Sequence, residues 1–228
     1  LPVDPVRRAV EMMMRHDLRS GFRRVGWVGD WPPSLPDGPV ILYANHHHVL
    51  DGHLAWLIAT ERLRRPSTVW MAEFDTFPFF AAVGVQPFPP DAPSRRAATI
   101  RRTGRRFRET PETVLVYFPE GELRAPDKGV RPFDAEAVQR IGRLYPEATW
   151  WPVAIHVTWW GESRPTALLR GGTPHAAADG DEHERLSTLW HDLRTQVPSD
   201  VEILLDGYRG ASEIWNFSFA TSFFERYL

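Results

Sequence analysis

The sequence predicts an α/β fold in a single domain, with a mostly parallel central sheet flanked by helices. Two apolar runs typical of buried strands, Val40–Ala44 and Thr113–Phe118, alternate with segments of helical periodicity. The chain has 228 residues and 43% apolar content, which suffices for one domain with a full core. Without a linker or repeat, we expect one domain over residues 1–228, comprising an N-terminal amphipathic helix and lead-in (1–34), a motif-bearing core (35–175) and C-terminal helices (176–228).

The N-terminal segment is predicted to form an amphipathic helix. Residues 4–18 place apolar side chains at helical spacing and arginines among the polar positions; the apolar set is Val6, Val10, Met13, Met14 and Leu18. Such a face either packs on the core or rests on a membrane. A strand over residues 22–28 and a proline-rich loop follow.

The rest of the chain continues this alternation. A strand over 68–72 precedes an aromatic segment, and residues 94–109 form an arginine-rich helix. Its expected buried face consists of Ala97, Ile100, Gly104 and Phe107. The basic rim of this helix is most commonly a solvated face, and a phosphate or anionic-lipid contact comes next. A nucleic-acid surface comes third, because no nucleic-acid motif accompanies the arginines. A strand within 150–160, a helix over 181–197, a strand over 201–205 and a closing helix over 214–228 complete the prediction.

The segment Asn45–Asp51 carries the clearest chemistry. His46 and Asp51 follow a buried strand, at the sheet edge where α/β proteins bind ligands. A histidine held by a carboxylate can act as a general base toward an alcohol. Positions five apart on a regular helix point about 140° apart, so the pair requires a turn with Asp51 near a helix start.

Two other interpretations of this segment stay open at this point. Asp51 could only cap a helix, with His46 an ordinary loop histidine. Alternatively, a metal could bind the crowded donors His46, His47, His48, Asp51 and His53. No paired-cysteine or His-Glu-x-x-His spacing supports the metal.

Composition excludes several classes of function. The chain has no cysteine, so disulfides, thiolate zinc sites and cysteine acyl-enzymes are excluded. A net charge of −2 does not favour nucleic acid as a partner. The only lysine, Lys128, lies in a polar stretch unsuited to Schiff-base chemistry. The sequence contains no run of 18 apolar residues, so we predict neither a membrane-spanning helix nor a signal peptide.

Three blocks together resemble the glycerol-3-phosphate and lysophospholipid acyltransferase superfamily. Asn45–Asp51 looks like its first motif, a histidine and an aspartate separated by four residues. Phe118-Pro119-Glu120-Gly121 looks like the third motif, and Trp151–Ile155 resembles the fourth, a proline-containing strand. Their order and spacing match over roughly residues 35–175.

The resemblance implies a glycerolipid acyltransferase-like fold and transfer of a fatty acyl group from acyl-CoA or acyl carrier protein to a lipid or glycerol-type hydroxyl. His46 would be the general base and Asp51 would orient it. The substrate-binding residues would be Phe118, Pro119, Glu120, Gly121 and Arg124. We expect no metal and no bound cofactor, and a bacterial, cytoplasmic enzyme of phospholipid biosynthesis at the membrane surface. The aromatic residues Phe74, Phe77, Phe79 and Phe80 either pack in the core or line an acyl-chain pocket.

Two alternatives to this function remain. One is a non-catalytic lipid-binding module of the same fold. The other, less favoured, is a metal-dependent hydrolase that uses the His46–His53 cluster.

The sequence departs from the superfamily at two places. Its third motif usually has an arginine where this chain has Leu123, and Arg124 falls one residue late. In the second motif, Val85–Asp91 is not followed by an arginine until Arg95 and Arg96. Since an arginine–phosphate pair depends on geometry, both changes weaken the case for a phosphate-bearing acceptor. A sugar hydroxyl or another lipid alcohol is the alternative.

Overall fold

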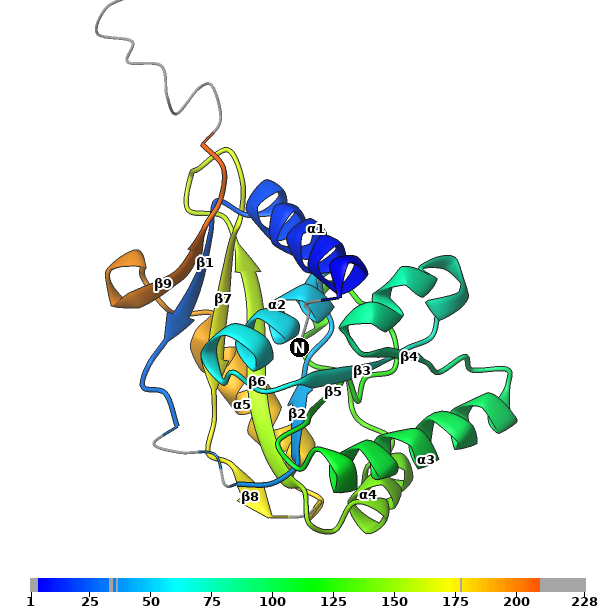
Figure 1. Cartoon of the computed structure of the whole chain (residues 1–228). Coiled ribbons are helices and arrows are strands. Elements are labelled where there is room, and N and C mark those ends of the chain that lie inside the picture. The colour runs from blue at the N-terminus through cyan, green and yellow to red at the C-terminus, as the bar shows by residue number, and fades with distance from the viewer. Residues whose placement is uncertain (1–3, 33–34, 36, 177, 210–228) are drawn as a thin grey trace, which may run out of the picture.

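The computed structural model describes residues 4–32, 35, 37–176 and 178–209, which form three layers with a sheet between helices (Figure 1). The strands of the described part are β1 (Arg24–Val28), β2 (Val40–Ala44), β3 (Ser67–Met71), β4 (Val85–Pro87), β5 (Val114–Tyr117), β6 (Thr149–Thr158), β7 (Thr166–Gly171), β8 (His175–Ala176) and β9 (Val201–Asp206). They confirm the predicted α/β class.

The sheet is mixed but mostly parallel. Its order is β4-β3-β5-β2-β6-β7-β1-β9, and β8 pairs with β6. The pairs β6·β7, β6·β8 and β1·β9 are antiparallel, and the other pairs are parallel. In the parallel pair β2·β5, Val40 lies opposite Val114 and Tyr43 opposite Tyr117. The carboxyl ends of β2 and β5 therefore meet at one edge, as predicted for the two motifs.

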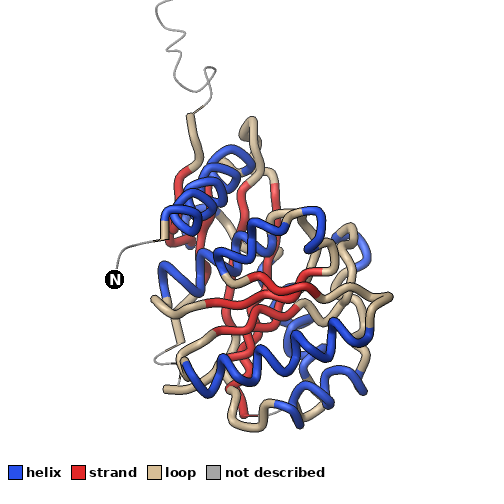
Figure 2. Tube along the Cα trace, turned by 45° about the vertical axis from the view of Figure 1, so that its right-hand side comes forward, coloured by secondary structure: helices blue, strands red, loops and turns tan. Residues whose placement is uncertain are grey.

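Helices cover both faces of the sheet (Figure 2). They are α1 (Pro5–Gly21), α2 (Asp51–Leu57), α3 (Pro93–Glu109), α4 (Ala135–Leu144) and α5 (Glu182–Leu193). A π-helical turn over Ile58–Arg62 extends α2, and short 3-10 turns span Phe74–Thr76, Pro78–Val83, Pro126–Lys128 and Pro198–Asp200. None of the described helices is both long and apolar enough to cross a bilayer.

The strands divide the core in two because successive side chains point to opposite faces. In β2, Val40, Leu42 and Ala44 pack with α1 and α2, whereas Ile41 and Tyr43 pack with α3, α4 and α5. Both faces of this strand are buried, which explains its uninterrupted apolar run.

One predicted helix face is wrong in part. Of the four residues expected to be buried in α3, only Phe107 is buried, and Thr99 and Thr103 occupy the centre of the face. Threonine can be buried there because its hydroxyl is bonded: Thr99 donates to the Pro87 carbonyl at 2.7 Å, and Thr103 accepts from the Trp70 indole at 3.0 Å.

The C-terminal region, predicted as helices, also contains a strand. Residues 176–228 contain α5, and then β9, which adds antiparallel to β1 as the predicted short strand. The closing helix predicted over 214–228 lies outside the described residues. At the other end, α1 packs on the core through Val10, Met14 and Leu18, and Val6 is exposed.

Candidate active site

Asn45 fixes the start of the loop between β2 and α2. Its buried side chain copies a strand pairing with β6: Nδ2 donates to the Ile155 carbonyl and Oδ1 accepts from the Ile155 N–H, both at 2.8 Å. Two complementary bonds to one residue leave the amide a single orientation. The loop therefore leaves the sheet at a defined point. The sequence motif includes Asn45 but indicates no role for it.

His46 and Asp51 are paired at the mouth of this loop. Nδ1 of His46 lies 3.1 Å from Oδ2 of Asp51, and the imidazole remains 25% exposed whereas the carboxylate is fully buried. Since a carboxylate only accepts, Nδ1 carries the proton. In the neutral imidazole, Nε2 is then the nitrogen that can accept a proton from a bound hydroxyl.

The Asp51 carboxylate organises the whole loop. The same Oδ2 accepts the backbone N–H groups of His47 at 2.7 Å and His48 at 2.8 Å. Asp51 is the first residue of α2, yet these donors precede the helix, so its side chain closes the turn and does not cap the helix. The helix N-terminus favours the negative charge as well.

The Glu120 carboxylate ties the second loop to the first. It is 4% exposed; Oε1 accepts the His46 N–H at 2.7 Å, Oε2 accepts the Arg131 N–H at 2.8 Å, and Nε2 of His47 lies 3.7 Å from Oε2. Burial alone would raise the pKa of Glu120, but the nearby His47 ring and the hydrogen bonds from the Arg131 and His46 N–H groups outweigh it and lower the pKa. Glu120 is therefore an internal anion that holds three parts of the chain.

Phe118 and Gly121 shape the same loop. The Phe118 ring stacks on His46 with 4.5 Å between centroids and 24° between planes. Gly121 has φ of +76°, a left-handed conformation that favours glycine, and its N–H closes a turn onto the Phe118 carbonyl at 3.1 Å. Both line the cavity described next, as do Pro119 and Glu120.

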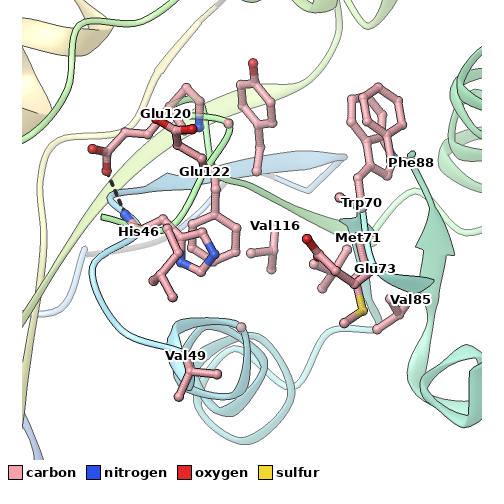
Figure 3. Close-up of a pocket in the computed structure, with 18 of the residues that line it drawn as sticks. His46, Val49, Trp70, Met71, Glu73, Val85, Phe88, Val116, Glu120 and Glu122 are labelled. Atoms are coloured by element: carbon pink, nitrogen blue, oxygen red, sulfur yellow. Dashed lines mark hydrogen bonds between the residues drawn. The ribbon is translucent and has the colours of Figure 1, made fainter. Parts of the chain in front are cut away.

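A cavity of about 910 Å³ opens beside His46. In Figure 3, His46, Glu120 and Glu122 lie at one end and Trp70, Met71, Val85 and Phe88 at the other, with Val116 between them. Phe77 and Phe80 also line the cavity, which favours the pocket-lining interpretation for two of the four aromatic residues. One end thus carries the histidine and two carboxylates, and the other is mostly apolar but includes Glu73, a pattern that suits an amphiphilic ligand.

The arginines near the cavity differ from the predicted one. Arg124 does not line it: its backbone N–H donates to the His46 carbonyl at 3.0 Å and its guanidinium pairs with Glu122. Arg96 and Arg131 do line it. Sequence reasoning missed Arg131 because it lies in no motif, and only the path of the loop brings it to Glu120.

The histidine cluster does not converge on a metal. His46 pairs with Asp51, His47 faces Glu120, and His53 lies 3.5 Å from Asp17 on α1. Elsewhere among the described residues, ligand atoms converge only at His175, Asp179 and Glu182. Those atoms already bond Tyr43, Arg185 and two backbone N–H groups.

Comparisons with known proteins agree with this geometry. The family model "Acyltransferase" matches residues 30–156, which include both motif loops. A similar solved structure is the 1-acyl-sn-glycerophosphate acyltransferase PlsC from Thermotoga maritima, with 16% identity, a TM-score of 0.57 and coverage of 84% of this chain and 82% of that one. No match was found among curated proteins. The chain belongs to the Acyltransferase family, as its motifs predicted, and it is an acyltransferase with the PlsC-type fold.

Proposed function

We propose that this protein transfers a fatty acyl group from a thioester to a hydroxyl of a lipid or related alcohol, with His46 as general base. The observation that carries the proposal is the His46–Asp51 pair at one end of a mostly apolar cavity. The similar Thermotoga maritima protein is a 1-acyl-sn-glycerophosphate acyltransferase by name, which supports a reaction in lipid metabolism.

In the proposed mechanism, Nε2 of His46 takes the proton of the acceptor hydroxyl as its oxygen attacks the thioester carbonyl. The C–S bond then breaks, and the leaving sulfur receives the proton from the imidazolium. Asp51 stabilises the imidazolium and keeps its ring oriented. No acyl-enzyme forms, so the reaction needs no cysteine nucleophile.

The cavity suggests how the substrates lie. We assign the acyl chain to the apolar end formed by Trp70, Met71, Val85 and Phe88, and the reacting carbonyl to the space beside His46. The donor is acyl-CoA or acyl carrier protein, whose charged groups would lie outside. Neither the mechanism nor the donor requires a metal or resident cofactor.

Contact with a membrane surface is part of the proposal. Val6 and Met12 on α1 are 56% and 58% exposed, and the turn that α1 contacts exposes Phe79. Arg7, Arg8 and Arg15 lie on the same helix. Exposed apolar side chains among arginines suit an anionic bilayer. Co-sedimentation with anionic vesicles at low salt tests this, and protein that stays in the supernatant would contradict it.

The test of the chemistry is His46→Ala, followed by thiol release from acyl-CoA with a panel of lipid and sugar alcohols. Because the protein has no cysteine, a thiol reagent reports only the released thiol. We expect a loss of roughly two to four orders of magnitude. His191→Ala is the matched control, since His191 is exposed on α5, and it should keep the activity. Unchanged release by His46→Ala would refute the proposed base.

A further inference from the structure

Glu122 binds two arginines at the polar end of the cavity. Its Oε1 accepts from Nε of Arg124 at 2.8 Å and from Nη1 of Arg131 at 2.6 Å. A guanidinium pair that converges on one oxygen anion is the arrangement that binds phosphate in many proteins. Here, a carboxylate of the chain itself occupies that position.

The other arginine that lines the described cavity is also bonded to the protein. Nη1 of Arg96 donates to the backbone carbonyls of Pro89 and Pro90. The position between Glu122 and Arg124 is Leu123, which lines the cavity and is 50% exposed. An entering phosphate would therefore meet an apolar side chain and guanidinium groups that already have partners.

The charges lining the cavity add to this barrier. The lining residues include four acidic ones, Glu73, Glu120, Glu122 and Asp134, and two arginines, Arg96 and Arg131, although the Glu120 carboxylate is itself buried. A dianionic phosphate ester brought beside Glu122 would be repelled, whereas an uncharged hydroxyl compound would not.

From these contacts we infer that Glu122 is a specificity residue that excludes phosphate monoesters, and that the acceptor is an uncharged alcohol such as a monoacylglycerol or a glycoside. This inference rests on the proposed function, because it assigns the polar end of the cavity to the acceptor. The side chains of Glu122, Arg124 and Arg131 are 52%, 42% and 41% exposed, so the ion pairs are screened and the discrimination is moderate.

Calorimetric titration with two matched ligands tests the inference. The ligands are 1-hexanoylglycerol and 1-hexanoylglycerol 3-phosphate, which share an acyl chain and differ only in the phosphate. We expect the wild type to bind the uncharged ligand about tenfold more tightly at low salt. Glu122→Gln should raise the affinity for the phosphate ester about tenfold and leave the other affinity within twofold.

Two further variants separate a specific arginine effect from a general charge effect. Glu73→Gln removes the same charge at the other end of the cavity (Figure 3), and it should raise phosphate affinity less than threefold. Adding Arg131→Gln to Glu122→Gln should abolish the gain.

Several outcomes would overturn the inference: tighter binding of the phosphate ester by the wild type, no gain in Glu122→Gln, an equal gain in Glu73→Gln, or no binding of either ligand. Each is a binding result, independent of thiol release. Failure of the general-base proposal would appear instead in the His46→Ala assay.

Discussion

Asp51→Asn discriminates between two ways in which Asp51 could support His46. In a serine-protease triad, asparagine at the equivalent place turns its NH₂ toward the histidine and imposes the wrong tautomer. In this protein, Oδ2 also accepts the N–H groups of His47 and His48 at 2.7 and 2.8 Å. An NH₂ group there would face two other donors. The amide oxygen should therefore take the place of Oδ2 and keep the proton on Nδ1 of His46.

The expected loss of activity in Asp51→Asn follows from the contacts that the substitution leaves unchanged. The amide oxygen keeps all three hydrogen bonds, and the NH₂ group takes the place of Oδ1, a buried atom without a partner. The loss is then the difference between a charged and a neutral acceptor for the developing imidazolium, about 1 to 1.5 kcal/mol. That corresponds to a fall in kcat of roughly 5- to 13-fold. The unbonded NH₂ group should destabilise the fold by about 1 to 3 kcal/mol.

The assay is thiol release at saturating acceptor, with thermal unfolding measured on the same samples. Asp51→Ala is the comparison, since it leaves His46 unsupported and two backbone N–H groups without an acceptor, so its activity should fall to the level of His46→Ala. If Asp51→Asn were as inactive as His46→Ala while still folded, the argument from the two backbone donors would be refuted. Activity equal to wild type would show instead that the charge has no role.

Two further predictions concern buried titratable groups. In Glu120→Gln, the NH₂ group must face either the His46 N–H or the Arg131 N–H, which leaves two donors opposed. We therefore expect urea unfolding to show destabilisation by about 1 to 3 kcal/mol, and thiol release to show a lower kcat. A variant as stable as the wild type would argue against the buried network. Burial, then Arg194 and His47, lowers the pKa of His156 from 6.5 to about 4. As the pH falls, the unfolded chain therefore binds the proton first, and the free energy of unfolding decreases between these two pKa values. From pH 7 to pH 5, urea unfolding should show that the wild type loses about 2 kcal/mol more stability than His156→Leu. An equal loss of stability in the two proteins would contradict this.

The sequence predicted those elements for which the residue pattern and the neighbouring residues indicate the same structure. The strand Val40–Ala44 was predicted to the residue because its apolar run is bounded by Pro39 and Asn45. The start of α2 at Asp51 followed from the geometry that a His46–Asp51 pair requires. The meeting of the two motif loops followed from parallel pairing alone, because each loop comes after a strand.

Features that depend on the path of the chain were not predictable in this way. Strand β7 pairs with both β6 and β1, so its place depends on two remote partners. Helix α4 was missed although Asp134 caps it, with its side chain accepting the Ala137 N–H at 3.1 Å. The contacts of Arg131 arise from the loop between Gly121 and Asp134, whose course no local pattern specifies.

The main chain of His46 explains why the third motif can vary in part without loss of the base. Its N–H donates to the Glu120 side chain and its carbonyl accepts the Arg124 backbone N–H, while Asp51 and Phe118 hold the ring. The side chains at positions 122 and 123 form none of these contacts. Substitutions there change which groups face the acceptor and leave the histidine in place, because residue 124 supports it only through its backbone. In the proposed reaction, acceptor specificity would therefore depend on side chains of the loop after β5, and general-base catalysis on His46 in the loop after β2.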